Sequence, residues 1–214
     1  MRQSDRAYRS LLDEIQSGAL PAGAVLAETE QSARLGVSRT PLRAALSRLA
    51  ADGLVVQQSP RVTVVTAIDA DDIRALFEVR RALEETAARI AAQRGDADAF
   101  AVLEWEFTTA AGALEGATAH DAYYALIARF DAAVDAAVAN DYLAQALRTV
   151  RTHLVRVRRL ARDKPERLAA SVGEHRLIAH ALARRDGDLA AHATHVHLHN
   201  ALESILVSLA EGTP

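Results

Sequence analysis

The 214-residue chain contains no cysteine, which excludes disulfide bonds and thiolate metal sites. Aromatic residues make up only 4% of it, so its hydrophobic half favours close-packed, alanine- and leucine-rich helices over a β-sandwich. No apolar run approaches the roughly 20 residues of a transmembrane helix. The polar residues 1–5 are unlike the start of a secretion signal. We therefore expect a soluble, cytoplasmic protein that does not bind membranes.

Lysine is nearly absent as well, and the charges are unevenly distributed. The formal net charge is −3. Residues 1–66 hold eight arginines against six acidic residues, a net charge of +2, so the remainder carries −5. All eight histidines follow residue 119. This asymmetry favours two domains with different chemistry, which we place at residues 1–66 and 69–212.

The first domain reads as three helices followed by a hairpin. Apolar spacing predicts helices over 5–17 and 28–34, and a third helix that ends near Asp52. Two β-branched runs, 54–56 and 62–65, then flank a polar turn. This order predicts a winged helix-turn-helix.

The segment 35–43 carries the strongest local signal. Gly36 permits the positive φ of a tight turn, Ser38 can cap the next helix, and Pro41 is tolerated in a first turn. Arg39 and Arg43 then lie on one helix face, away from an apolar stripe formed by Leu42, Ala45, Leu46 and Leu49. A helix of this kind fits the major groove of DNA. The alternative is an arginine face that is merely solvated.

The second domain reads as helices separated by short polar or glycine-containing breaks. Asp69 is a good N-cap for the first of them, and Ile73, Phe77, Arg80 and Leu83 belong to its inner stripe. The pattern predicts helices over 69–94, 97–114, 119–138, 141–162, 165–185 and 188–210. The expected fold class is mainly α, with an N-terminal winged helix-turn-helix followed by an antiparallel all-helical bundle.

With both halves placed, the chain resembles the GntR family of bacterial transcription regulators, in the FadR-like branch with an FCD ligand domain. The motifs are Leu-Pro-Ala-Gly at 20–23, the segment 35–43, Gly-Leu-Val at 53–55, Glu-Val-Arg-Arg-Ala-Leu-Glu at 78–84 and Glu174-His175. The resemblance implies a homodimer that binds a pseudo-palindromic double-stranded operator, in most cases as a repressor. A small carboxylate effector bound in the bundle would control that binding.

Carried over position by position, the resemblance implies DNA contacts by Arg39, Thr40 and Arg43, beside Ser38. Arg34 and the wing-tip residue Arg61 are further candidates for the phosphate backbone. The chain also departs from the family pattern. Gln31-Ser32 replaces Leu-Ala. Thr29 replaces an arginine found in some members, Ala44 replaces a glutamate and Val62 replaces a glycine.

The family often holds a divalent metal through an Asp-x-x-x-His pair and two later histidines. His175 and His197 match the later pair, but Ile127 stands where the aspartate is expected and Asp131 where the first histidine is expected. The resemblance therefore implies a reduced set of Asp131, His175 and His197, for which zinc is the favoured transition metal. Asp135, one turn after Asp131, serves as a substitute for the missing ligand only if its helix is rotated. The alternative is a histidine face without a metal.

The phase of the last helix leaves the choice of histidine open. Its apolar stripe, from Leu198 onward, places His195 near the centre of the inner side, and His197 and His199 on either flank. The sequence does not decide which of the three faces the site.

For the effector, Arg80 is the leading candidate because an unpaired charge on an inner stripe is costly. A structural ion pair with Glu84, one turn later, is the alternative. Arg151 and Arg156 are further candidates, since planar guanidinium groups match carboxylates.

Three functions follow from these patterns. The leading one is a ligand-responsive DNA-binding regulator that is not an enzyme. The second is a hydrolytic enzyme with a metal at Asp131, His175 and His197, although no convincing general base accompanies that set. The third is an architectural DNA-binding dimer that binds no ligand.

Overall fold

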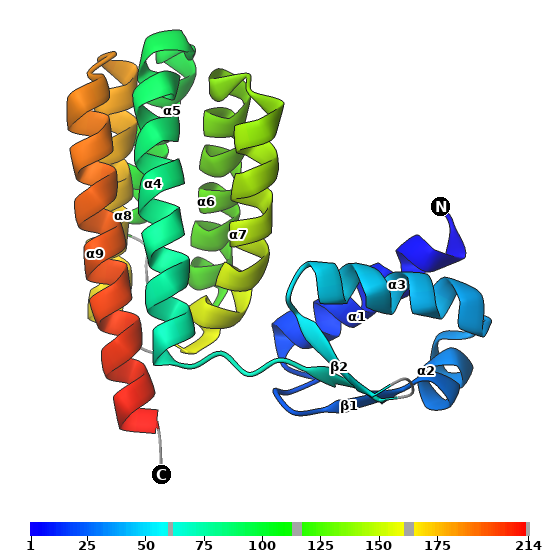
Figure 1. Cartoon of the computed structure of the whole chain (residues 1–214). Coiled ribbons are helices and arrows are strands. Elements are labelled where there is room, and N and C mark those ends of the chain that lie inside the picture. The colour runs from blue at the N-terminus through cyan, green and yellow to red at the C-terminus, as the bar shows by residue number, and fades with distance from the viewer. Residues whose placement is uncertain (60–61, 113–116, 161–164, 213–214) are drawn as a thin grey trace. The chain divides into compact units, whose positions relative to one another are not determined.

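The computed structural model describes residues 1–59, 62–112, 117–160 and 165–212. The chain divides into two compact units (Figure 1). One comprises Met1–Asp69 together with Thr152–Arg159, and the other comprises Ala70–Arg151 and Leu160–Pro214. Within the described residues, no helix is long and apolar enough to cross a membrane.

The N-terminal unit contains the three predicted helices, α1 (Gln3–Ser17), α2 (Glu28–Leu35) and α3 (Arg39–Ala51). Gly18 and Gly36 end the first two helices in the left-handed conformation, with φ of 76° and 62°. This conformation is unstrained in glycine, and it turns the chain sharply after each helix.

A small sheet completes this unit. Strands β2 (Val55–Ser59) and β3 (Val62–Val65) form the predicted hairpin, with a register shift between Gln57 and Ser59. Strand β1 (Val25–Ala27), which the sequence analysis missed, pairs antiparallel with β3, so the order is β1-β3-β2. The wing is thereby anchored beside the start of α2.

The core of the N-terminal unit is aliphatic. Helices α1 and α3 pack against each other, and α3 packs against β2. Fully buried leucines come from α1, β1, α3 and the residue before β2: Leu11, Leu26, Leu42, Leu49 and Leu54. Every residue of the predicted α3 stripe is buried, which leaves the opposite face of that helix open to solvent.

The second unit is a helical bundle, as predicted. Observed and predicted helix ends agree within one turn where the structure describes them. The helices are α4 (Ala70–Arg94), α5 (Ala97–Ala110), α6 (Ala117–Val138), α7 (Asp141–Leu160), α8 (Pro165–Ala183) and α9 (Gly187–Gly212). Residues Thr152–Arg159 of α7 are grouped with the first unit.

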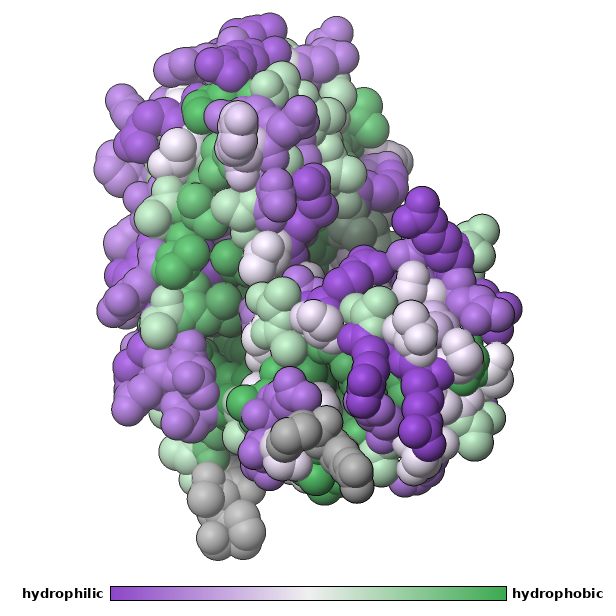
Figure 2. All heavy atoms as spheres, turned by 45° about the vertical axis from the view of Figure 1, so that its right-hand side comes forward, coloured by the Kyte–Doolittle hydropathy of each residue, from purple (hydrophilic) through white to green (hydrophobic). Residues whose placement is uncertain are grey.

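Small side chains let the bundle helices pack closely. Helix α4 lies along α9, and α5 lies along α8 (Figure 1). Alanines fill the core of the unit where α4 and α9 contribute to it, among them Ala87, Ala91, Ala190 and Ala193. Apolar side chains also reach the surface of the bundle between polar ones (Figure 2).

Candidate functional sites

The turn between α2 and α3 positions one exposed helix face. The Val37 amide donates to the Ser32 carbonyl over 3.1 Å, and the Val37 side chain is buried. Ser38 occupies the N-cap position in extended backbone, although its side chain makes no capping hydrogen bond. Arg39, Thr40 and Arg43 are exposed on α3. The structure thus presents the three leading DNA-contact candidates together on one helix.

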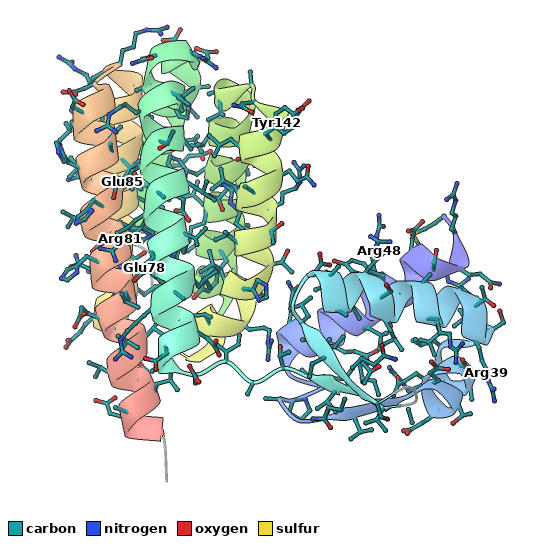
Figure 3. The ribbon with its side chains drawn as sticks, in the orientation of Figure 1. Arg39, Arg48, Glu78, Arg81, Glu85 and Tyr142 are labelled. Carbon is teal, nitrogen blue, oxygen red and sulfur yellow. The ribbon has the colours of Figure 1, made fainter. Side chains whose placement is uncertain are left out.

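The arginines of this unit differ in their contacts within the protein. Arg39 lies at the first residue of α3 and Arg48 near its other end (Figure 3). The Arg48 guanidinium contacts Asp5 at 2.8 Å and lies 4.0 Å from the centre of the Tyr8 ring. Tyr8 in turn donates to Asp52 over 2.6 Å. These contacts make Arg48 a link between α3 and α1.

Arg34, predicted as a backbone contact, is also engaged within the protein. Its Nη1 and Nη2 donate to the two carboxylate oxygens of Glu14, at 2.8 and 2.7 Å. Its Nε donates to Gln31 Oε1 over 3.0 Å. Gln31 is buried, so the departure from leucine at this position has a structural role in holding Arg34. The remaining candidate, Arg61, lies outside the described residues.

In the bundle, His175 lies among aromatic rings. Its ring is stacked on Phe107, with 5.4 Å between centroids, and the Phe130 ring lies edge-on at 5.9 Å. The Nδ1 atom lies 2.8 Å from the Ser171 carbonyl and 2.9 Å from the Tyr123 hydroxyl. Because a carbonyl oxygen only accepts, Nδ1 carries a proton and donates it to Ser171.

His197 is buried beside His175, with 4.4 Å between the two ring centroids. Its Nδ1 donates to Glu174 over 2.7 Å, so the neutral ring has its lone pair on Nε2. Burial lowers the pKa of His197, although the Glu174 hydrogen bond opposes that shift. His195 is by contrast half exposed and pairs with Glu85. Helix phase had placed His195 nearest the inner side of the helix, but His197 is the buried residue.

Glu174 is the centre of this hydrogen-bond network. It also accepts two hydrogen bonds from Arg167, at 2.8 and 2.6 Å, and one from Asn200 at 2.7 Å. Burial by itself would raise the pKa of Glu174, but the hydrogen bonds from His197, Arg167 and Asn200 outweigh it and lower the pKa to about 2. The carboxylate is therefore ionised at neutral pH.

Two of the three predicted effector arginines, Arg80 and Arg151, form ion pairs within the bundle. Arg80, only 4% exposed, donates to Glu84 over 2.8 Å, so the ion pair considered as an alternative is present. Arg151 contacts Asp131 at 3.4 Å and Asp135 at 2.6 Å. Burial would raise the pKa of Glu84, but the charge of Arg80 and its hydrogen bond lower it, with smaller contributions from His197 and Arg151. Arg80, Glu84, Arg151 and His197, with the acidic partners of Arg151, therefore form one interior cluster. Arg156 falls in the segment 152–159, outside it.

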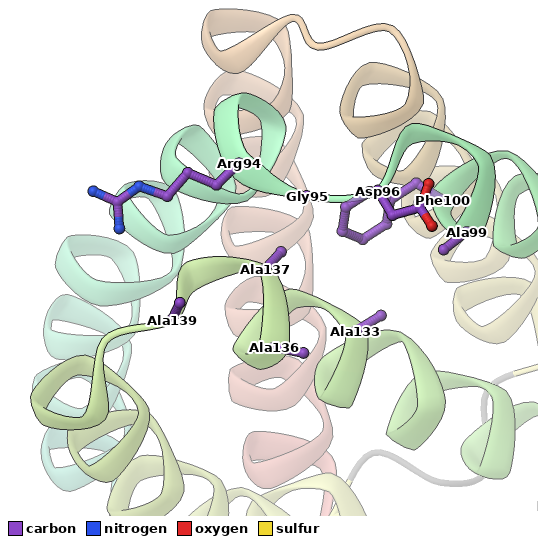
Figure 4. A pocket seen from close by; sticks show the side chains of 9 residues that line it. All are labelled: Arg94, Gly95, Asp96, Ala99, Phe100, Ala133, Ala136, Ala137 and Ala139. Atoms are coloured by element: carbon purple, nitrogen blue, oxygen red, sulfur yellow. The ribbon is translucent and has the colours of Figure 1, made fainter.

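A separate cavity lies at one end of the bundle. It has a volume of about 410 Å³ and is lined by the alanine methyl groups of α6, by Phe100, and by Arg94, Gly95 and Asp96 of the α4–α5 connection (Figure 4). The predicted metal and effector residues do not line this cavity.

Family models match both units. A model of "Bacterial regulatory proteins, gntR family" matches residues 3–65, and a model of the FCD domain matches residues 75–200. The chain belongs to the GntR family and carries an FCD domain. It is therefore a DNA-binding transcriptional regulator.

Individual relatives agree with this assignment. The chain is 33% identical over 186 residues to a probable D-xylose utilization operon transcriptional repressor of Paenarthrobacter nicotinovorans, covering 86% of this chain and 80% of the relative. It is 38% identical over 82 residues to an uncharacterized HTH-type transcriptional regulator of Agrobacterium vitis, 38% of this chain and about half (48%) of that relative's length. The fold is similar to that of E. coli McbR/YncC, with a TM-score of 0.77, 18% identity and full coverage of both chains.

The donor set in the FCD domain does not fit the metal site that the resemblance implies. Ile127 is buried in the apolar core where a carboxylate is expected. Asp131 is held by Arg151, and within the described ranges no three histidine or acidic side chains are placed to share a metal ion. Zinc sites take at least three protein ligands. The structure brings His175 and His197 together but does not bring Asp131 to them.

Glu28, Glu174 and Tyr123 were missed as site residues. Glu174 precedes His175 in one of the motifs that carry the family resemblance, so the sequence did contain a signal for Glu174. Glu28 on α2 accepts a hydrogen bond from Arg43 on α3, 15 residues later, and Tyr123 on α6 contacts His175 on α8, 52 residues later. Helical spacing within one segment carries no signal for such contacts.

Proposed function

We propose that this GntR regulator is a homodimeric repressor whose binding to a pseudo-palindromic operator is controlled by a small carboxylate bound in the FCD bundle. The exposed face of α3 carries the proposal. It presents Arg39, Thr40 and Arg43 from a helix whose other face is fixed in the core. Such a helix reads base edges in the major groove.

Repression is supported by the names of relatives. The Paenarthrobacter protein is named a probable repressor, and a second relative, RspR of Escherichia coli, is named a transcriptional repressor. The chain is 29% identical to RspR over 199 residues. The direct test is a reporter gene placed behind a DNA site that the protein selects from random duplexes. Expression of the reporter should rise when the regulator is removed.

Dimerisation is supported by the α4–α9 surface. Val79 on α4 and Val196 on α9 are about half exposed. Glu78, Arg81 and Glu85 alternate in charge along the side of α4 nearest α9 (Figure 3). A two-fold related copy of the same surface can match both the apolar and the charged groups. We expect a dimer in sedimentation experiments, weakened by Val79→Glu but not by Val102→Glu on α5.

Our proposal locates the effector at the interior cluster. A ligand carboxylate competes with Glu84 for the buried Arg80, and bidentate geometry suits that exchange. The neutral His197 ring beside this pair adds a nitrogen lone pair, which accepts a hydrogen bond from a ligand hydroxyl group. A selective ligand stabilises the folded state and therefore raises the melting temperature.

One experiment separates the proposed function from its alternatives. The full-length dimer is screened against small mono-, di- and hydroxycarboxylates by thermal shift, with operator binding followed by fluorescence anisotropy. We expect a hit that releases DNA and that Arg80→Gln abolishes. Operator binding without any hit favours the architectural dimer, and metal-dependent turnover lost in His175→Ala favours the enzyme.

A further inference from the structure

We infer that Glu28 is a specificity-determining residue that orients Arg43 end-on toward a guanine base. The inference rests on the DNA-binding function of the family. It assigns different roles to arginines that the sequence alone treats as equivalent.

The contact joins the first residue of α2 to the second turn of α3. Arg43 Nε donates to both carboxylate oxygens of Glu28, at 2.8 Å to Oε1 and 3.0 Å to Oε2. The Glu28 side chain is 17% exposed, whereas that of Arg43 is 63% exposed. The carboxylate is therefore fixed against the protein, while the guanidinium extends into solvent.

The atom that Glu28 contacts distinguishes this pair from the others in the unit. Glu14 takes both terminal nitrogens of Arg34, and Asp5 takes a terminal nitrogen of Arg48. Glu28 takes only Nε of Arg43. Among the residues that the structure describes, Nη1 and Nη2 of Arg43 have no hydrogen-bond partner. The terminal edge of the guanidinium stays available.

That edge has the geometry required to read a base. Two terminal N–H groups match the O6 and N7 acceptors of guanine, the commonest specific contact in the major groove. Because Glu28 has already restricted the long arginine side chain, less rotamer freedom is lost on binding. Arg39 has no such contact with the residues that the structure describes, so it keeps that freedom.

The charge of Glu28 acts in the same direction. A carboxylate beside the DNA-facing helix repels phosphates and so weakens sequence-independent binding, which depends on neutralised phosphate charge. It also holds the cation away from neighbouring phosphates. Glu28 therefore lowers the affinity for DNA of any sequence and strengthens discrimination at one base pair.

The test uses full-length protein and a binding site selected from random duplexes. Affinity for that site, for each single-base-pair variant and for unrelated DNA is measured by fluorescence anisotropy at fixed salt. Arg43→Ala identifies the base pair that Arg43 reads. At that position, Glu28→Gln should lower discrimination at least about fivefold and should tighten binding to unrelated DNA.

The matched control is Glu30→Gln, which removes the same charge from an exposed residue of the same helix. It should shift affinity for all sequences by a common factor. Glu28→Gln in the Arg43→Ala background should not change discrimination further. Equal discrimination by Glu28→Gln and wild type, or a uniform shift like that of Glu30→Gln, overturns the inference.

Two further outcomes are distinguishable. If Glu28→Gln unfolds, Glu28→Asp replaces it, since a shorter carboxylate keeps the charge but cannot hold Nε equally well. Retention of full discrimination by a folded Glu28→Asp overturns the inference. If wild type selects no sequence at all, the proposed operator-binding function fails together with this inference.

Discussion

His197 on α9 donates to Glu174 on α8 over 2.7 Å, and the side chains are 9% and 14% exposed. The pKa of Glu174 in the folded protein is about 2, below its ordinary 4.5. A depressed carboxyl pKa adds stability above the unfolded value and loses it as the pH falls through the folded value. The contribution of Glu174 is therefore complete above about pH 5 and declines between pH 4.5 and 2.

This network gives the first prediction. Glu174→Gln should lower the free energy of unfolding at pH 7 by about 2–3 kcal/mol, because it removes the charge that three donors stabilise. The difference from wild type should shrink toward zero near pH 2. Urea unfolding at several pH values measures it. Glu166→Gln, an exposed change on the same helix, should leave stability unchanged at every pH.

Local patterns predicted much of the fold, and contacts between distant segments account for what they missed. The α3 stripe and the positive φ of Gly36 follow from neighbouring residues, and both are confirmed. Strand β1 is only three residues long and exists because β3 pairs with it. No periodicity within Val25–Ala27 can report that partner.

The same limit applies to the interior cluster. Arg80 was predicted from its own helix and is buried, but phase on α9 pointed to His195 rather than His197. Helix α9 packs against both α4 and α8, so its first half buries a wide arc that includes Ala190, Thr194 and His197. The narrow apolar stripe formed by the leucines in the second half of α9 therefore does not predict which residues are buried in its first half.

Arg39 and Arg48 give the second prediction, because they share a helix but not a role. Arg39→Ala should weaken operator binding at least about tenfold without changing the melting temperature. Arg48→Ala should leave operator binding unchanged and cost less than about 1 kcal/mol of stability, since its ion pair is half exposed. Anisotropy and thermal denaturation of the two variants check this. Equal DNA affinity of the two variants contradicts it.

Ser32 gives the third prediction. Its hydroxyl oxygen is buried and, within the described part of the chain, has no hydrogen-bond partner. An unsatisfied buried hydroxyl costs about 1–3 kcal/mol, so Ser32→Ala should raise the free energy of unfolding by about 1 kcal/mol. Chemical denaturation measures the change. The exposed Ser47→Ala on α3 is the control and should be neutral, and a destabilised Ser32→Ala speaks against an orphaned hydroxyl.

Metal binding gives the last prediction. The His175 and His197 rings lie side by side, but the Asp131 carboxylate contacts Arg151 instead of joining them. Two protein ligands bind zinc weakly. After dialysis against micromolar zinc, the full-length protein should hold less than one ion per chain, as measured by elemental analysis, and its melting temperature should not rise. One retained zinc per chain, lost in His175→Ala but kept in the exposed His192→Ala, would show instead that the ion displaces Arg151 from Asp131.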